Sequence, residues 1–263
     1  SAVDLTLQGK RVRLFEFPEF KSNIEGLVEH PTLTATGAVA GEGRLDLVTT
    51  DLSEAVSGAD TIMVCTQALV HDRTAQDLAR LVEPHQLVIL NPGSTGGALL
   101  FAKRFRDSGL KKLPTLVELA TLTYGCRARG STVHIAVKVN RVLYGTLPAR
   151  AASSVGPELE ALYPGLRRGA TVLEEGLNNA NPVIHPPITM LNSALIEREG
   201  DRRFFYGDGV SPAVARLIRK LDGERMALLR ALGYPAQPDP VTSVEQGYAT
   251  STDYHACYRH GPG

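Results

Sequence analysis

The stretch that decides the fold is residues 61–97, TIMVCTQALVHDRTAQDLARLVEPHQLVILNPGSTGG. It contains two short runs, 61–65 and 86–90, that are apolar on both faces, as the strands of a parallel sheet are. Between them, His71 to Val82 has the spacing of a helix. A strand, a helix, a strand and a second helix after the glycine-rich turn predict a doubly wound α/β sheet of Rossmann type.

The residues before this stretch have the pattern of the second half of a dinucleotide-binding unit. Residues 1–10 predict an amphipathic helix that ends at Gly9, and a short β-rich run follows at 11–15. Glu16 ends that run, at the position where a carboxylate accepts hydrogen bonds from adenosine ribose hydroxyls. No Gly-rich phosphate loop precedes the helix. We therefore expect a sheet that lacks its first strand and a sequence that is a fragment.

Further elements are expected on either side of the central stretch. The sequence predicts two short strands within 33–50, separated by the Gly-Glu-Gly turn at 41–43. Asp51 and Glu54 form a capping box at the start of a short helix. The remaining expected elements of this domain are helices at 18–30 and 151–162, a strand at 116–120, and two β-rich runs between 131 and 149.

The pattern of the sequence changes after Gly169. Apart from TVL at 171–173, the rest is expected to be mostly helical, including 212–232, where apolar residues fall on one face. This predicts an incomplete dinucleotide-binding domain at 1–168 and an incomplete helical substrate domain at 169–263. The last 25 residues have little apolar periodicity, so we expect a frayed terminus there.

Ligands of doubly wound sheets bind beyond the carboxyl ends of the strands. That rule selects the residues that directly follow the predicted strands. The expected cofactor-binding residues are Glu16, Thr66, Gln67, Asn91, Pro92 and Gly93. The glycine-rich turn at 93–97 places backbone N–H groups at a helix start, where they suit a phosphate or a carboxylate; a flexible connection is the alternative.

Residues 176–198, GLNNANPVIHPPITMLNSALIER, concentrate polar and stiff residues. His185 precedes two prolines, which favours an extended backbone and places its imidazole at a helix start. The amides just upstream are Asn178, Asn179 and Asn181. Such amides suit a substrate carboxylate or the orientation of an imidazole. A structural histidine in an asparagine-rich turn is the alternative, and we favour a functional site at His185.

Glu118 is the other conspicuous polar residue, because it interrupts the apolar run LVELATL at 116–122. A buried carboxylate must be paired or must have a raised pKa, since an unpaired buried charge is costly. Tyr124 follows closely and adds a hydroxyl that suits an amino-acid ligand. We therefore take both residues as candidates for a substrate site.

Composition and charge exclude several classes of protein. Lys plus Arg and Asp plus Glu are both 28, so the sequence has no electrostatic footprint for nucleic acid or an anionic membrane. No segment has the length of a membrane span or the pattern of a signal peptide, which favours the cytoplasm. Three scattered cysteines agree with a reducing compartment. His255, Cys257 and His260 lack an evident fourth ligand, so we expect no metal site.

Several stretches resemble the opine dehydrogenase family, which includes the octopine and nopaline dehydrogenases. They are RVRLFEFPEF (11–20), TTDLSEAVSGADTIMVCTQALVH (49–71), LNPGSTGGAL (90–99), LVELATLTYGCR (116–127), NPVIHPPITMLNSALIE (181–197) and FFYGDGVSPAVARLIRKLDGERMALLRALGY (204–234). The resemblance implies an oxidoreductase that condenses an α-keto acid with the amino group of an amino acid. NAD(P)H then reduces the imine to a secondary amine.

The resemblance also implies roles for individual residues. His185 matches the acid/base residue, which acts on the keto oxygen with help from a carboxylate and an arginine beyond this sequence. The residues that map to the amino-acid pocket are Glu118, Tyr124, Asn179 and Asn181. Leu119 stands where relatives often carry threonine, which leaves the amino-acid specificity open. Because the phosphate loop and the family's C-terminal segment are missing, we expect the fragment to be nearly inactive and the complete protein to be active.

The expected cofactor is NAD, because the acidic Glu16 repels a 2′-phosphate; NADP is the alternative, since Lys21 is close in sequence. The expected partners are a keto acid and an amino acid, and a homodimer is compatible with the sequence. Two other functions stay open. One is a ketopantoate-reductase-like enzyme of the 6-phosphogluconate dehydrogenase-like group, although no lysine lies in a polar cluster such as those enzymes use. The other is a non-catalytic binding protein.

Overall fold

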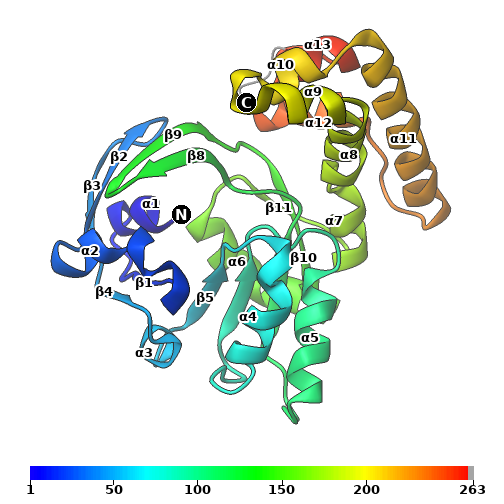
Figure 1. Ribbon diagram of the computed structural model, residues 1–263. Helices are drawn as coiled ribbons and strands as arrows, with labels where there is room; N and C mark the ends of the chain where they lie inside the picture. Colours follow the sequence, from blue (N-terminus) through cyan, green and yellow to red (C-terminus); the bar gives the residue numbers. More distant parts are fainter. Residues whose placement is uncertain (260–263) are drawn as a thin grey trace.

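The computed structural model describes residues 1–259, without the side chain of Asp201. Its central sheet has five strands in the order β11, β10, β7, β6, β5. Their bounds are Leu166–Arg168, Val142–Leu147, Thr115–Leu119, Leu87–Leu90 and Thr61–Val64. Strands β5, β6 and β7 are parallel, and β10 is antiparallel to β7. The carboxyl ends of the three parallel strands therefore meet at one edge of the sheet (Figure 1).

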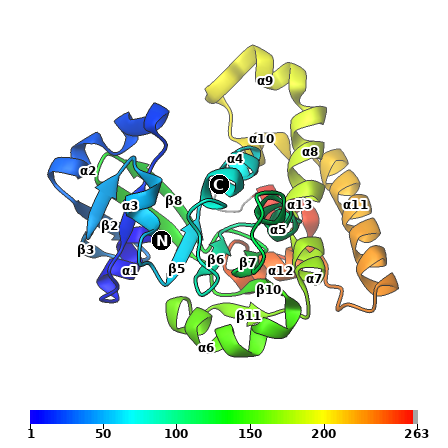
Figure 2. The same ribbon diagram turned by 90° about the horizontal axis from the view of Figure 1, so that it is seen from below.

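Helices cover both faces of this sheet (Figure 2). They are α4 (His71–Leu78) and α5 (Gly97–Asp107) on one face and α6 (Ala152–Leu162) on the other. Alternate residues of a strand point to opposite faces. Accordingly, Val88 and Leu90 pack with the α5 residues Phe101 and Phe105, whereas Ile89 packs with residues of α6. The near-continuous apolar strands are thus explained by burial on both sides.

The remaining strands form two smaller sheets. β1 (Arg13–Phe15) and β4 (Leu47–Thr49) make a parallel pair. A four-stranded sheet has the order β3, β2, β9, β8, with bounds Gly41–Arg44, Thr32–Gly37, Thr132–Lys138 and Tyr124–Arg129. The short helices of this part are α1 (Ala2–Leu7), η1 (Pro18–Asn23), α2 (Glu25–Glu29) and α3 (Leu52–Val56).

Two sequence expectations were wrong in this region. The Gly-Glu-Gly segment is part of β3 and not a turn. A Cβ on Gly43 would lie 1.8 Å from the Thr6 hydroxyl oxygen, so the glycine provides room for α1 to pack on the strand. Tyr124 lies at the start of β8, although no strand was expected there.

Seven helices extend from residue 172 to the end of the described chain. They are α7 (Val172–Asn178), α8 (Asn181–Leu191), α9 (Ser193–Glu199), α10 (Phe205–Gly209), α11 (Pro212–Ala231), α12 (Asp239–Gln246) and α13 (Tyr254–Arg259). The turns η2 (Ala68–Val70), η3 (Ala149–Ala151) and η4 (Gly200–Arg202) complete the secondary structure. α7 packs against β10 and β7, and the later helices form a separate group (Figure 1).

The C-terminal part differs from expectation in two places. The TVL segment begins a helix, because the Thr171 side chain accepts hydrogen bonds from the backbone N–H groups of Leu173 and Glu174. The segment after Pro238 is not frayed, since Cys257 and Tyr258 are buried against α8 and α11. The predicted α/β class, with a Rossmann-type sheet and a helical region, is confirmed.

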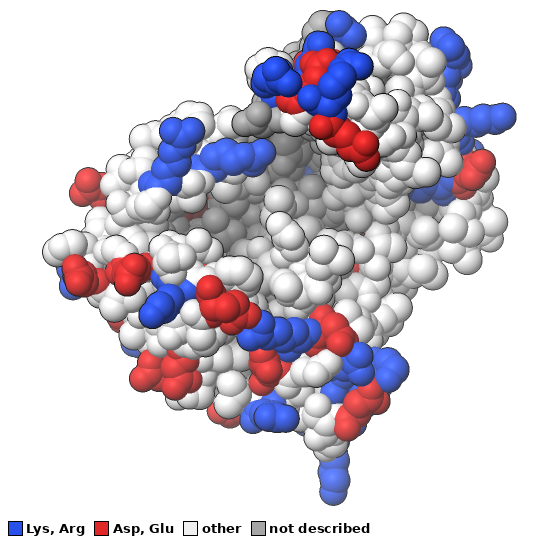
Figure 3. Space-filling model, in the orientation of Figure 1, with Lys and Arg blue, Asp and Glu red and all other residues white. Residues whose placement is uncertain are grey.

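Acidic and basic side chains are interspersed over the face shown in Figure 3, and neither sign forms a large patch there. No helix among residues 1–259 has both the length and the apolar character needed to cross a membrane.

The junction between β10 and α7 generates a test of the packing. A Cβ on Gly145 would lie 2.6 Å from Val172 Cα and 2.7 Å from Thr171 O. We expect Gly145→Ala to lower the free energy of unfolding in urea by about 2 kcal/mol, because backbone and not a flexible side chain must move. The matched control is Gly223→Ala in α11, where nothing lies within 4 Å. That change should be neutral or stabilising, and equal losses in both variants would contradict this account.

Candidate active site

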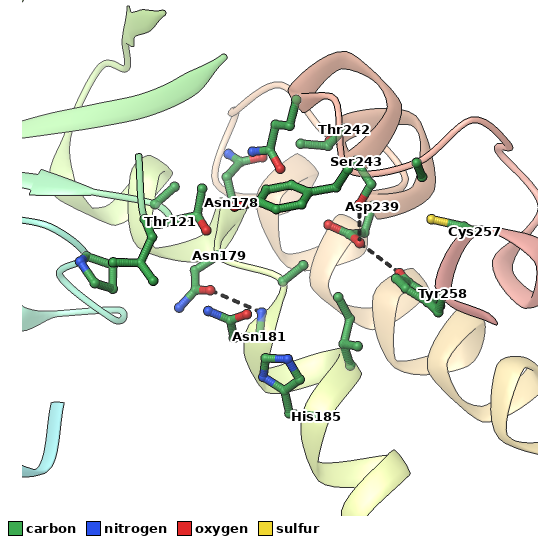
Figure 4. A pocket seen from close by; sticks show the side chains of 18 of the residues that line it. Thr121, Asn178, Asn179, Asn181, His185, Asp239, Thr242, Ser243, Cys257 and Tyr258 are labelled. Carbon is green, nitrogen blue, oxygen red and sulfur yellow. Dashed lines mark hydrogen bonds between the residues drawn. The ribbon is translucent and has the colours of Figure 1, made fainter. Parts of the chain in front are cut away.

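A cavity of about 330 Å³ lies between the carboxyl ends of β6 and β7 and the helices that follow α7 (Figure 4). Pro92 follows β6, and Ala120, Thr121 and Leu122 follow β7. The opposite wall consists of residues from α8, α10, α12 and α13, together with the end of α7 and the residues that follow α7 and α12. Its polar side chains are Asn178, Asn179, Asn181, His185, Tyr206, Asp239, Thr242, Ser243, Gln246, Tyr248 and Tyr258. The cavity therefore occupies the edge of the sheet where ligands of this architecture bind.

His185 lines this cavity from α8 and is half-buried. Its Nε2 lies 2.7 Å from the hydroxyl oxygen of Tyr206. The ring also packs edge-on against Phe205, with ring centroids 5.8 Å apart. Burial lowers the pKa of His185 below its ordinary value of 6.5, because a low-dielectric environment disfavours the charged imidazolium. The imidazole is therefore mostly neutral near pH 7 and readily gives up a bound proton.

His185 does not precede a helix, as the sequence suggested. α8 begins at Asn181 and runs through the two prolines, with another proline in its first turn. Asn179 lies between α7 and α8, and its side-chain oxygen accepts a hydrogen bond at 3.1 Å from the N–H of Asn181, the first residue of α8. Ile184 and Ile188 pack α8 into the core of the helical part. Tertiary packing thus overrides the local preference of a residue before proline.

The turn between β6 and α5 is held in a strained conformation. Ser94 and Thr95 have φ angles of 58° and 67°, which side chains with a Cβ rarely adopt. The Thr95 hydroxyl donates to Gly176 O at 2.9 Å and accepts from Asn179 Nδ2 at 3.1 Å. These contacts connect the turn with the end of α7. Strain of this kind is characteristic of functional turns.

Both the oxygen and the nitrogen of the Asn179 side-chain amide are consequently hydrogen-bonded within the protein, although the residue lines the cavity. Asn181 is exposed and contributes its side chain to the cavity wall. Asn181 is therefore the better placed of the two predicted amides to contact a ligand.

Glu118 is fully buried and does not line the cavity. Its carboxylate accepts hydrogen bonds from the backbone N–H groups of Gly96, Gly97 and Ala98 at 2.7, 3.1 and 2.8 Å. It thus satisfies the N-terminus of α5. The sequence suggested a phosphate or a carboxylate at the N–H groups of the glycine-rich turn, and the internal carboxylate of Glu118 uses the N–H groups of Gly96, Gly97 and Ala98.

The presence of a glycine at position 93 is explained by packing inside the protein. A Cβ at that position would lie 2.0 Å from Glu118 Cγ, so the glycine makes room for the buried side chain. The role of Gly93 as a cofactor contact is not needed to explain why the residue is a glycine.

Glu175 is a second fully buried carboxyl group beside Glu118. Among residues 1–259, no N–H or O–H group donates to the carboxyl oxygens of Glu175. The neighbouring group is the carboxylate of Glu118, with which Glu175 shares a proton. Burial and the neighbouring charge of Glu118 raise the pKa of Glu175 well above 4.5. Burial also raises the pKa of Glu118, and the three backbone N–H groups oppose that rise. We therefore place the negative charge on Glu118 and the proton on Glu175.

The other predicted site residues lie away from the cavity. The Glu16 carboxylate accepts from Phe17 N at 2.9 Å and from Asn23 Nδ2 at 3.2 Å, beside the β1–β4 pair. Thr66 and Gln67 follow β5. Asn91 is buried and bonds to the backbone and side chain of Thr123.

Tyr124 is buried too, and its hydroxyl donates to the carboxylate of Asp4. The structure thus brings Pro92, Asn179, Asn181 and His185 together and separates Tyr124 and Glu118 from them.

Sequence reasoning missed the contribution of the last helices. Asp239 is buried in the cavity wall and accepts hydrogen bonds from Tyr258 at 2.7 Å and Ser243 at 3.2 Å. Burial raises the pKa of Asp239. The signal was present, because Pro238, Asp239 and Pro240 have the composition of a helix start. Tyr206 lies in the 204–234 stretch that resembles the family, and no local pattern marks it as a site residue.

The cysteine and histidine residues near the end of the sequence do not form a metal site among residues 1–259. Cys257 lines the cavity, and His255 lies on the same helix. His260 lies outside the described residues.

Comparisons with known proteins agree with this architecture. Residues 168–262 match the family model of the α-helical domain of NAD/NADP octopine/nopaline dehydrogenases. The chain is 32% identical over 232 residues to an opine dehydrogenase of Arthrobacter sp. (strain 1C), which covers 88% of this chain and 64% of that protein. Other curated relatives are covered to about half their length, from 48% to 52%. The chain therefore spans less than two thirds of the length of these curated relatives.

Solved structures with the same fold include an octopine dehydrogenase determined with NADH and L-arginine. It has a TM-score of 0.70 and a sequence identity of 18% to this chain. The match covers 99% of this chain and 69% of the octopine dehydrogenase chain. A yersinopine dehydrogenase with NADP⁺ bound has a TM-score of 0.74 and 19% identity, covering 90% and 62%. The resemblance to the opine dehydrogenase family is confirmed.

The buried carboxyl pair generates a prediction about pH. A raised pKa in the folded state stabilises the protein below about pH 4.5, and this contribution is lost as pH rises toward the folded-state pKa. Glu175→Gln cannot ionise, so we expect a higher melting temperature than wild type at pH 8 and a smaller difference at pH 5. Thermal unfolding at both pH values measures this. Glu197→Gln, an exposed change in α9, is the control.

Glu118→Gln should behave in the opposite way. Its amide would direct N–H groups at the backbone donors of α5, at a cost of about 1 to 3 kcal/mol at either pH. If Glu118→Gln stabilised the protein and Glu175→Gln did not, the assignment of proton and charge would be reversed.

Proposed function

We propose that the complete protein is an opine dehydrogenase, which joins an α-keto acid to the amino group of an amino acid and reduces the product with NAD(P)H. The observation that carries the proposal is the position of His185. Its imidazole faces a cavity at the carboxyl ends of β6 and β7. Rossmann-type sheets bind dinucleotides at the same edge, beyond the carboxyl ends of their strands. The confirmed family resemblance supports the same reaction.

The residues after β5 fit a dinucleotide. The hydroxyl oxygen of Thr66 is buried and has no hydrogen-bond partner among residues 1–259. An orphaned polar atom of this kind suggests a ligand group that satisfies it. Thr66, Gln67 and Glu16 are the residues that would hold the nucleotide. When bound, the nicotinamide supplies the hydride that reduces the imine carbon.

The chain's own chemistry is proton transfer at His185. Condensation of a keto acid with an amine releases the keto oxygen as water, so that oxygen must gain protons. Protonated His185 would donate one of them, and burial makes the imidazolium a stronger acid by lowering its pKa. In the reverse direction, the neutral imidazole accepts a proton from water. Asn181 and Thr121 offer neutral hydrogen-bonding groups that orient the substrate in the cavity.

A ketopantoate-reductase-like reaction is less well supported. No lysine lines the cavity among the described residues. Lys103 pairs with Asp107 within α5, and Lys138 pairs with the buried Asp4. A histidine-centred site therefore favours the opine reaction over a lysine-centred one. A non-catalytic binding protein would keep the cavity and show no turnover.

The first test replaces His185 in the complete gene product. His185→Asn should lower NADH oxidation with pyruvate and an amino acid by at least about 100-fold, because the acid/base group is removed. The anisotropy of NADH fluorescence, which rises when the cofactor binds, should show that cofactor binding is unchanged. His30→Asn, an exposed change, is the control. Retained turnover in His185→Asn would remove the proposed role, and a wild type inactive with every keto acid and amino acid tested would favour a binding protein.

The second test concerns the cofactor. Because the Glu16 carboxylate repels a 2′-phosphate, we expect a higher kcat/KM with NADH than with NADPH. Glu16→Gln should narrow that difference by improving the rate with NADPH. Initial rates with both cofactors measure it, and a preference of about tenfold for NADPH in the wild type would show that Glu16 does not select the cofactor.

A further inference from the structure

A buried ion pair on α11 lies next to the cavity without lining it. Asp222 and Arg225 are three residues apart, so they point from the same face of the helix. Arg225 Nε donates to Asp222 Oδ1 at 2.7 Å. The Asp222 side chain is fully buried, and that of Arg225 is 7% exposed. An ion pair buried this deeply needs further hydrogen bonds, and both residues make them to segments outside α11.

Arg225 connects two segments that each lead into the cavity wall. Its Nη1 donates to Leu177 O at 3.1 Å, and its Nη2 donates to Gln237 O at 2.7 Å. Asn178 directly follows the first acceptor, Asp239 lies two residues after the second, and both line the cavity. The guanidinium is planar and its N–H groups have fixed directions. Its two hydrogen bonds therefore hold the segments at one separation.

Asp222 fixes the second segment through its other carboxylate oxygen. Oδ2 accepts hydrogen bonds from the backbone N–H of Asp239 at 2.9 Å and from the Tyr254 hydroxyl at 2.6 Å. Asp239 is the first residue of α12. The carboxylate thus satisfies an N–H group at the start of α12, whereas Arg225 satisfies a carbonyl group at the end of α7. Each charge has the sign that the helix terminus favours.

The two helices that this pair connects contribute different sides of the cavity. Asn178 and Asn179 come from the end of α7 and the residue after it. α12 contributes four polar residues, which are Asp239, Thr242, Ser243 and Gln246. Figure 4 shows Asn179 and Asp239 at separate positions around the cavity. The space between these two sides therefore depends on the contacts of Arg225.

We propose that Arg225 is a positioning residue that sets the separation between the end of α7 and the start of α12, and thereby the fit of the amino-acid substrate in the cavity. This inference rests on the proposed function, because it assigns a role within the same site. With pyruvate as the keto acid, the amino acid is the larger of the two substrates and spans more of the cavity, so a displaced wall affects it more.

The contacts of the ion pair are all present within residues 1–259. A carboxylate or an arginine that the complete protein adds beside His185 would meet walls that this pair has already fixed. The role of Arg225 is therefore compatible with further groups from elsewhere in the protein.

Lysine cannot replace the guanidinium in this position. An ammonium group is a compact charge on a flexible stem and can keep the ion pair with Asp222. It cannot direct donors at both backbone carbonyls in the fixed geometry of the guanidinium. Arg225→Lys therefore keeps the charge and removes at least one wall contact. Because a buried carbonyl without its donor is unfavourable, that wall should shift.

The experiment compares the kinetics of Arg225→Lys and the wild type in the complete protein, with NADH, pyruvate and a set of amino acids. We expect KM for the amino acid to rise at least about tenfold, since a buried carbonyl loses a charged donor. This rise should exceed the fall in kcat, and KM for NADH should stay within about twofold of the wild type, because the residues after β5 are not contacted by Arg225. Arg219→Lys, an exposed change on α11, is the control and should match the wild type.

Asp222→Asn provides a second variant in case Arg225→Lys does not fold. It keeps the shape of the side chain and removes the charge that holds Arg225 Nε, so KM for the amino acid should rise in this variant too. An unchanged KM for every amino acid, together with a lowered melting temperature, would show that the pair only stabilises the helices and would overturn the proposal.

Amide hydrogen exchange supplies a readout that needs no turnover. In Arg225→Lys we expect faster exchange in peptides that cover 177–181 and in peptides that cover 237–243, with β6 and α5 unchanged. Faster exchange confined to α11 would contradict the role of Arg225 as a connection between the two walls. A wild type that turns over no substrate would refute the proposed function, and the exchange measurement would still decide whether Arg225 holds both walls.

Discussion

The buried carboxylate of Glu118 is the contact on which the rest of the site depends. It accepts three backbone hydrogen bonds at the start of α5 and therefore fixes the turn that leaves β6. That turn contains Pro92, which lines the cavity, and Thr95, which bonds to the end of α7. An unpaired charge buried this deeply would be strongly destabilising. The helix N-terminus makes the carboxylate tolerable, and the carboxylate gives the turn one conformation.

The same arrangement connects the sheet with the helical part. Thr95 contacts Gly176 O and Asn179, and Asn179 in turn accepts a hydrogen bond from the N–H of Asn181, the first residue of α8. α8 carries His185, so the position of the imidazole relative to the strand ends is set by a short chain of polar contacts. None of these contacts touches a reacting atom. They position the group that does, which is how precise sites are usually built on rigid elements.

The sequence predicted the fold well where burial is two-sided and periodicity is strong. The runs at 61–65 and 86–90 and the long helix after Ser211 were found because apolar spacing alone identifies them. Short elements were less predictable. β3 contains two glycines and has no strand signature, and its glycine at 43 reflects the approach of α1. Contacts between segments distant in sequence decide such cases, and a pattern of neighbouring residues does not contain them.

The site was predicted in part for a related reason. Residue type indicated polar groups that matter, and it could not say whether a ligand or the protein itself uses them. Glu118, Asn91 and Tyr124 bond within the fold, whereas His185 and Asn181 face the cavity.

A buried polar group must have a partner, and the protein supplies one whenever backbone N–H groups or hydroxyls are within reach. Residues that keep an unused polar atom toward a cavity are therefore the more informative candidates. By that criterion the imidazole of His185, which lines the cavity, is a more informative candidate than the buried polar groups that only hold the structure together.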